Sequence, residues 1–553
     1  MNDKTGNVSQ QRRWLLAALA LGAFYSALAL RLAFRAPNLV QDDARQHVFW
    51  MRRFIDPTLF PQDLIADYFQ AVAPAGYKFV YWIFAKFGVD PLLLSRILPA
   101  VLGLFIAWLA FLVFMQLMPN PRGAFFASVL LGQLVWLRDD LISATPRAFV
   151  WPLFLGFVLF LLRGRVVACL TMLALEALVY PQAAFVTLGL LGLRLIKRQD
   201  RHLRLSGDRR DYIVFVAAIL IFTAAILPFA SSTSRYRPVI TAAEACALPE
   251  FQRHGRSQFF VRGLSYWADA PRSGLFPNAT PPHILLLAIA APLCLIFARK
   301  KFRSAVLTQS AIAATTMWGT AHLFLFKLHL PARYSQWFFQ IFFAMGAAAT
   351  IAAVWEAVDD WRERSRQRSA TFAARLLSVA LALFAAGLLV YPHLKEKFPD
   401  QSYVAAHPAE LYEFLRTQPK DTVIATLRNL GSLVPVFAQR SVLVSSEHAI
   451  PYHKGYYDVI RRRGQDLVRA EFTPRPEELR AFIEHYHVGL IIVGRTPLAA
   501  QDVKKLRWFG EITDRPQSAE QPALLGFVGA CKVWENNAIT VLDAHRITAL
   551  IKP

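Results

Sequence analysis

Apolar runs divide the first 391 residues into segments that are long enough, or nearly long enough, to cross a membrane. The hydrocarbon core of a bilayer is about 30 Å thick and needs about 20 helical residues. Eleven such runs alternate with polar loops, at residues 14–34, 91–118, 123–137, 148–162, 166–180, 182–196, 212–229, 282–298, 304–326, 335–356 and 372–391. The pattern predicts a polytopic α-helical membrane domain over residues 1–391, with about 11 transmembrane helices.

The loops between these runs differ in charge. Lysine and arginine clusters near residues 12, 122, 163, 198, 300 and 364 fall on one side, and the acidic and proline-rich loops fall on the other. The positive-inside rule makes the basic side cytoplasmic. We therefore expect a protein of the cell (inner or plasma) membrane with a cytoplasmic N-terminus and two large outer loops, 35–90 and 230–281. Residues 77–88 are apolar but too short to cross, and we expect an interfacial or re-entrant helix there.

From about residue 392 the pattern changes to that of a soluble domain. Short apolar runs at 421–426, 441–445 and 488–494 read as buried strands, and helical segments lie at 408–417, 456–470 and 475–487. Strand and helix alternate, which favours an α/β domain with a parallel sheet. An odd number of spans places this domain, residues 392–553, outside the cell. No GxGxxG sequence follows its first strand, so we assign it no nucleotide.

Composition narrows the functional classes. Hydrophobic residues make up 55% of the 553 residues and charged residues 18%, which is too apolar for a soluble protein of this length. The net charge of +23 lies mostly in short loops between apolar runs, so it indicates membrane topology and contact with membrane lipid rather than nucleic-acid binding. The four cysteines, without CxxC spacing, indicate neither a disulfide framework nor a zinc site.

The first candidate for chemistry is the acidic sequence directly after the first apolar run. Asp42 and Asp43 are followed by His47, four residues beyond Asp43, so a helix would place these two on one face. Ionisable groups next to a membrane are costly and suggest a functional site. The alternative is a solvated loop after an anchor.

A second acidic pair, Asp139-Asp140, falls on the same predicted side of the membrane. If the two pairs converge, a carboxylate could act as a general base towards an acceptor hydroxyl, or bind a divalent metal such as Mg or Mn through oxygen ligands. The alternative is that each pair forms salt bridges with the nearby Arg45, Arg138 or Arg147.

Two arginines at the outer mouths of spans are candidates for binding a lipid-linked phosphate. Arg147 stands in Thr-Pro-Arg, and Arg333 stands in Leu-Pro-Ala-Arg-Tyr beside Tyr334. A guanidinium stays charged when desolvated and binds phosphate in a bidentate manner. The alternative is an arginine that reaches the interface from an apolar helix.

Weaker candidates lie nearby. His322 and His329 are close to Arg333 in sequence, and Tyr180-Pro-Gln182 could line the same cavity. Glu447-His448, and further along the same stretch His453, follow an apparent strand, where open α/β sheets commonly carry ligand sites.

These features together resemble the GT-C fold of integral-membrane glycosyltransferases, such as protein O-mannosyltransferases, lipid A aminoarabinose transferases and oligosaccharyltransferase catalytic subunits. The resemblance rests on layout over residues 10–390, on Gln41-Asp-Asp-Ala-Arg-Gln-His47 and on a helix of the type Asp90-Pro-Leu-Leu-Leu-Ser-Arg. It implies that Asp42 or Asp43 is a catalytic base or metal ligand, that Asp139-Asp140 is a second acidic motif, and that Arg333 lies near the lipid phosphate. The WWD-type motif of oligosaccharyltransferases is missing from the C-terminal domain, which disfavours protein N-glycosylation.

The resulting hypothesis is an enzyme that moves a sugar from a polyprenyl-phosphate donor to a glycan, lipid or protein acceptor outside the cell. Arg333 and Arg147 would hold the phosphate, and Asp42 or Asp43 would deprotonate the acceptor hydroxyl. The alternatives are a transporter or flippase, or a non-catalytic envelope-assembly protein. The transferase hypothesis requires both acidic pairs and Arg333 to face one cavity.

Overall fold

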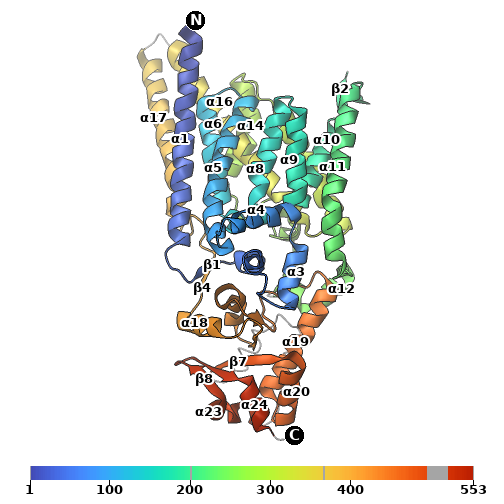
Figure 1. The fold of residues 1–553 in the computed structure, drawn as a ribbon. Coiled ribbons are helices and arrows are strands. Elements are labelled where there is room, and N and C mark those ends of the chain that lie inside the picture. Colours follow the sequence, from blue (N-terminus) through green and yellow to red (C-terminus); the bar gives the residue numbers. More distant parts are fainter. Residues whose placement is uncertain (1, 200–201, 254, 365–367, 495–520, 552–553) are drawn as a thin grey trace.

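A bundle of long helices and a smaller domain that contains a sheet make up the protein, and the chain's two ends lie at opposite extremes (Figure 1). The computed structural model describes residues 2–199, 202–253, 255–364, 368–494 and 521–551. We call the end of the bundle that meets the smaller domain the domain end. Its opposite end carries the chain's N-terminus.

Each of the eleven predicted spans coincides with one helix of the described bundle. These helices are α1 (Asn2–Ala33), α5 (Pro91–Leu117), α6 (Pro121–Trp136), α8 (Val150–Leu162), α9 (Val166–Val179), α10 (Pro181–Leu193), α11 (Arg209–Ser234), α14 (Pro282–Phe297), α15 (Ala305–Leu323), α16 (Gln336–Arg364) and α17 (Arg368–Val390). Among the described residues, five helices (α1, α5, α11, α16 and α17) are long and apolar enough to cross a membrane. The others pack beside them, so the chain is a multi-pass membrane protein.

The first loop folds into short helices at the domain end of the bundle. They are α2 (Ala44–His47), the 3-10 helix η1 (Phe49–Phe54), α3 (Leu64–Val72) and α4 (Ala75–Lys86). Figure 1 shows α4 lying across the ends of the bundle helices. Tyr77 and Tyr81 of α4 are buried, whereas Phe79 and Trp82 are exposed. A helix with one apolar face turned outwards at this level suits a membrane interface, as the sequence predicts.

The smaller domain contains a five-stranded sheet in the order β6-β5-β7-β9-β8. The strands are β5 (Val423–Ala425), β6 (Ser441–Val442), β7 (Val488–Gly494), β8 (Lys532–Glu535) and β9 (Ile539–Asp543), and the helices around them include α18 (Ala409–Thr417), α19 (Lys454–Phe472), α20 (Pro476–Tyr486) and α24 (Ala544–Leu550). The predicted parallel pairing holds for β6, β5 and β7. The sequence did not reveal β8 and β9, which pair antiparallel and make the sheet mixed.

A two-stranded ribbon joins the first loop to the smaller domain. Strand β1 (Leu39–Gln41) pairs antiparallel with β4 (Tyr403–Ala405), with Gln41 opposite Tyr403. The amide N–H of Asp42 extends the ladder by donating to the carbonyl of Ser402 at 2.9 Å. The first acidic pair is therefore held in place by a segment about 360 residues away.

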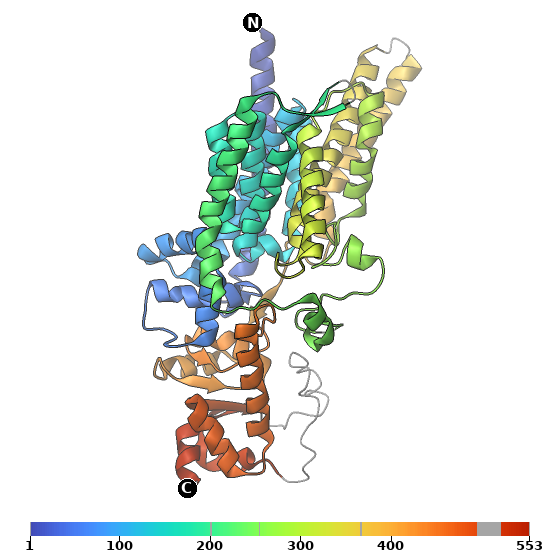
Figure 2. The ribbon, with the colours of Figure 1, turned by 90° about the vertical axis from the view of Figure 1, so that its right-hand side faces the viewer.

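The long loop between α11 and α14 also packs on the smaller domain. The N–H of Ile240 donates to the carbonyl of Tyr452 at 2.9 Å, and the N–H of Lys454 donates to the carbonyl of Pro238 at 2.9 Å. Figure 2 shows this green segment between the bundle and the domain. The first loop, the long loop and the smaller domain thus meet at the domain end.

Candidate functional site

Asp42 and Asp43 point to different neighbours because they follow the end of strand β1. The side-chain Oε1 of Gln41 accepts from the N–H groups of Asp43, at 2.8 Å, and Ala44, at 3.0 Å, which turns the chain into α2. Asp43 faces the bundle and pairs with Arg147. Asp42 faces outwards, with its side chain 45% exposed, and pairs with Arg45.

The second acidic pair lies beside the first at the same end of the bundle. Asp139 and Asp140 begin α7 (Asp139–Ile142), and Asp140 is fully buried. Arg138 Nε donates to Asp140 Oδ2 at 3.1 Å. The loop that follows is anchored by the hydroxyl of Tyr81, which donates from α4 to the carbonyl of Ala144 at 3.0 Å.

Arg147 bridges the two acidic motifs. It stands in the 3-10 helix η2 (Pro146–Phe149), directly after a proline that fixes the first position. Its Nη1 donates to Asp140 Oδ1 at 2.8 Å, and its Nη2 donates to Asp43 Oδ2. One guanidinium thus holds a carboxylate from the first loop and a carboxylate from the second.

Arg333 joins the same group from a third loop of the chain, in the 3-10 helix η4 (Pro331–Tyr334). Its Nη1 lies 3.6 Å from Asp140 Oδ1, and its guanidinium lies over the ring of Trp337 at 5.6 Å. The Tyr334 hydroxyl donates instead to the carbonyl of Leu328 at 2.8 Å, and the residue is buried. Tyr334 therefore supports the turn that presents Arg333, and its hydroxyl is not directed at the carboxylates.

We name this group of side chains the inner network; its members are Asp43, Asp140, Arg138, Arg147 and Arg333. Burial would raise the pKa of Asp43, but Arg147 in particular lowers it below its ordinary value. Burial acts on Asp140 in the same way, and Arg147, Arg138 and Arg333 outweigh it, so its pKa is also lowered. Both carboxylates are ionised at neutral pH.

Asp139 differs from its two neighbours. Burial, and then the negative charge of Asp140, raise the pKa of Asp139 to about 7. Its side chain is half-buried and takes part in none of the salt bridges of the inner network. A carboxyl group that gains and loses a proton near neutral pH thus stands next to two that stay ionised.

His47 lies next to Asp43 and is uncharged at neutral pH. Burial lowers the pKa of His47 to about 4, although the charge of Asp43 works in the opposite direction. Its ring meets that of Phe69 edge-on, with ring centres 5.5 Å apart. A neutral imidazole in this position could orient a hydroxyl group but brings no positive charge for a phosphate.

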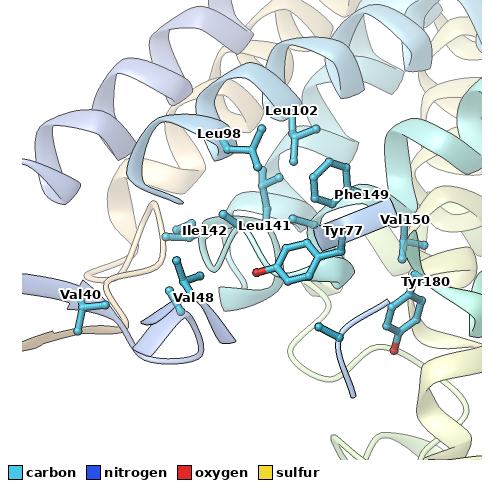
Figure 3. Close-up of a cluster of buried hydrophobic side chains, with 14 of the residues drawn as sticks. Val40, Val48, Tyr77, Leu98, Leu102, Leu141, Ile142, Phe149, Val150 and Tyr180 are labelled. Carbon is cyan, nitrogen blue, oxygen red and sulfur yellow. The ribbon is translucent and has the colours of Figure 1, made fainter. Parts of the chain in front are cut away.

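Buried apolar side chains enclose the inner network on the bundle side. Figure 3 shows Tyr77 of α4 packed near Leu141, Ile142 and Phe149, with Tyr180 further along the same wall. All five are buried. Such walls exclude water and strengthen the electrostatic interactions of the charged groups.

A second group of charged side chains lies on the other side of the Asp42–Asp43 pair. We name it the outer clasp; its members are Asp42, Arg45, Arg256 and Glu447. Arg45 donates to Asp42 Oδ1 and to Glu447 Oε2, at 2.5 Å in both cases. Arg256, from the long loop, donates to Glu447 Oε1 at 2.5 Å and to the carbonyl of Ser446 at 3.1 Å. The clasp therefore ties the smaller domain to both loops, next to the acidic pair.

The four histidines that the sequence suggests as weaker candidates lie in different surroundings. His448 is buried, and its Nδ1 lies 2.7 Å from the hydroxyl of Ser445. His453 Nδ1 bonds to the hydroxyl of Tyr68 at 2.9 Å. Burial and then Arg333 lower the pKa of His329 to about 3, which places that ring near the network. His322 instead meets the carbonyl of Ser273 at 3.0 Å.

Among the described residues, the predicted metal site at Asp139 and Asp140 has no cluster of ligands around it. In the part of the chain that the structure describes, no group of three or more histidine, cysteine, aspartate or glutamate side chains is arranged to hold a metal ion. Both oxygens of Asp140 face arginines instead.

Comparison with known proteins supports the fold alone. No family model and no curated protein matches the sequence. The crystal structure of the apo oligosaccharyltransferase of Archaeoglobus fulgidus aligns at 11% identity with a TM-score of 0.51, covering 90% of this chain and 71% of that one. The same enzyme, AglB, in complex with an inhibitory peptide and a dolichol-phosphate aligns at 12% identity with a TM-score of 0.52, covering 91% and 72%. A complex of that enzyme with Zn and sulfate aligns with a TM-score of 0.47 at 12% identity, covering 89% and 69%. The chain has a GT-C-like fold.

Proposed function

We propose that the protein is a membrane glycosyltransferase that moves a sugar from a polyprenyl-phosphate-linked donor to an acceptor outside the cell. One observation carries the proposal: Asp43, Asp140, Arg147 and Arg333, from three distant segments, meet at the domain end of a membrane bundle. The likeness to AglB, described with a dolichol-phosphate and a peptide, supports the same reading. The basic loops at the other end support an extracytoplasmic site.

Asp43 is the proposed base. Arg147 holds its Oδ2 and leaves Oδ1 for an acceptor hydroxyl. That oxygen takes the hydroxyl proton as the acceptor oxygen attacks the anomeric carbon, whose configuration inverts. The bond from this carbon to the phosphate oxygen breaks, and its electron pair leaves with the lipid phosphate. The step needs one base and a stable leaving group.

Arg333 is the proposed binding group for the lipid phosphate. Its salt bridge to Asp140, at 3.6 Å, is the longest in the inner network, and the aromatic ring of Trp337 supports its guanidinium. It therefore keeps donors for an incoming anion, whereas both terminal nitrogens of Arg147 already donate to carboxylates. This assigns the phosphate role to Arg333 alone.

The test is to delete the gene in its host and compare envelope glycans and lipid-linked sugars by mass spectrometry. We expect a sugar to be lost from one acceptor and its lipid-linked form to accumulate. Wild-type protein should restore the sugar, and Asp43→Asn should not, at equal membrane levels. If Asp43→Asn restores it fully, the proposed chemistry is wrong.

A further inference from the structure

We propose that Arg147 is a built-in cation that occupies the bridging position between the carboxylates of the two acidic motifs, so that the site works without a resident divalent metal ion. The observation is that one guanidinium contacts Asp43 Oδ2 and Asp140 Oδ1 at once. The inference deepens the proposed function, but its main readout, metal binding, does not depend on that function.

The charges around the bridge argue against an additional divalent ion. Asp140 Oδ1 faces Arg147 at 2.8 Å and Arg333 at 3.6 Å, and its Oδ2 faces Arg138 at 3.1 Å. Three arginines already face two ionised carboxylates in a region where Asp140 is fully buried. Two further positive charges would have to be desolvated there without new carboxylates to balance them.

The ligand set argues in the same direction. Hard cations such as Mg²⁺ or Mn²⁺ take about six oxygen ligands. Both oxygens of Asp140 and one of Asp43 are engaged by arginine N–H groups. Of the two other carboxylates in these motifs, Asp42 pairs with Arg45, and Asp139 alone is outside these ion pairs. The residues present do not fit a resident divalent ion.

Arginine is suited to this bridging position. Its guanidinium stays charged at any physiological pH, and its planar fork presents two terminal nitrogens to two acceptors, which the single ammonium of lysine does not do. Arg147 thereby acts as a positioning residue: it keeps Asp43 ionised and fixes Oδ2, which orients the free oxygen. A chelator cannot remove it.

The test measures Mn²⁺ binding by electron paramagnetic resonance on the purified full chain in lipid nanodiscs. Wild type should bind no Mn²⁺ in the micromolar range. Arg147→Ala leaves Asp43 and Asp140 without the cation between them. It should gain one Mn²⁺ site, whose affinity is at least tenfold higher than that of any Mn²⁺ binding by wild type. Arg147→Lys should gain none, because its charge remains.

Two control variants locate the new site. The double variant Arg147→Ala/Asp43→Asn should lose the gained binding. Arg53→Ala removes another arginine of the first loop, whose one salt bridge among the described residues is to Asp67, and should gain none. Tight Mn²⁺ binding by wild type, or no gain in a folded Arg147→Ala protein, overturns the proposal. If Arg147→Ala does not fold, the wild-type titration still decides it.

Activity gives an independent readout. Wild-type membranes treated with EDTA should transfer sugar at the untreated rate, and a loss that added Mn²⁺ or Mg²⁺ restores would overturn the inference. A protein that transfers no sugar under any condition would contradict the proposed function instead. The Mn²⁺ titrations would still report on the bridge in that case.

Discussion

The inner network and the outer clasp are built from the same residue types, and adjacent aspartates belong to different groups. In the inner network the side chains of Asp140 and Arg147 are 0% and 15% exposed. In the outer clasp Asp42 is 45% exposed, whereas Arg45 and Glu447 are 14% and 11% exposed, and Glu447 comes from the smaller domain. The inner network joins segments of the bundle end, whereas the clasp joins the bundle end to the smaller domain.

Residue type does not distinguish a candidate for catalysis from a group that holds two parts of the protein together. The burial of the aspartate and the identity of its partners do. An ion pair with an exposed member is screened by water and contributes little to stability. A buried carboxylate among arginines stays ionised and keeps a fixed orientation, and little water reaches it. A general base requires this arrangement. We therefore expect unequal effects when matched residues of the two groups are exchanged.

The largest expected difference is between Asp43→Asn and Asp42→Asn. Removing a general base typically costs about 100- to 10,000-fold in rate. We expect such a loss in the transfer rate of Asp43→Asn, and less than about tenfold for Asp42→Asn, since Asp42 only pairs with Arg45. Rates are measured in proteoliposomes with the lipid-linked sugar identified in the deletion strain. Equal losses in the two variants would contradict the separation of the groups.

Much of this site could be predicted from the sequence, because charges at the ends of apolar runs are rare and visible. Asp43, Asp139-Asp140, Arg147 and Arg333 were all selected in this way. The choice between Asp42 and Asp43 was not possible, because it depends on β1 pairing with β4, far away in the chain. Local spacing carries no information about that pairing.

The roles of the arginines were also beyond the sequence. Arg147 and Arg333 look alike as residues at span ends, and only the contacts distinguish a bridge between carboxylates from a group with free donors. In the fold, apolar runs revealed all eleven bundle helices, since each must satisfy its own backbone in lipid. Strands β8 and β9 escaped because they follow each other closely in the chain and pair antiparallel, outside the alternation of strand and helix that marks the three parallel strands.

The second prediction concerns Arg333 within the inner network. Arg333→Ala should raise the KM for the lipid-linked donor and lower kcat/KM by about 100-fold, because a buried, charge-assisted phosphate contact is lost. Arg333→Lys should recover part of the loss, since it keeps the charge without the fork. Tyr334→Phe is the comparison variant: it removes the bond to the Leu328 carbonyl that supports the turn but keeps the guanidinium, so donor KM should rise much less than in Arg333→Ala. A donor KM unaffected by Arg333→Ala would contradict the phosphate role.

The third prediction concerns Glu447 in the outer clasp. Glu447→Gln weakens the contacts of both Arg45 and Arg256, so the smaller domain should be held less firmly against the loops. We expect a rise in acceptor KM and a fall in kcat/KM of about tenfold, with donor KM unchanged. Steady-state kinetics with each substrate varied in turn separates the two. Glu244→Gln is the matched control: it weakens an exposed pair with Lys454 and leaves a side-chain oxygen for the exposed capping contacts with Thr241, so it should have little effect.

The smallest expected effect is a change in the pH dependence of stability, and it comes from Asp139, the carboxyl group next to the inner network. Burial, and then Asp140, raise the pKa of Asp139 to about 7, whereas an unfolded aspartate titrates near 4. Between about pH 4 and pH 7 the folded protein therefore keeps the proton of Asp139, whereas the unfolded chain has released it. Stability from this group is present below about pH 4, declines as pH rises to about 7, and changes no further above that.

Asp139→Asn removes this contribution. Thermal unfolding in nanodiscs should show a fall in Tm from pH 5 to pH 8 that is smaller, by a few degrees, in Asp139→Asn than in wild type. His47, whose pKa burial lowers to about 4, adds a change of the opposite sign over an overlapping range, and it is present in both proteins. The difference between the two proteins therefore isolates Asp139. Identical Tm shifts would show that Asp139 is ionised at pH 5. A third charged carboxylate would then lie beside the inner network, and the charge balance would be less unfavourable to a metal ion than the three arginines indicate.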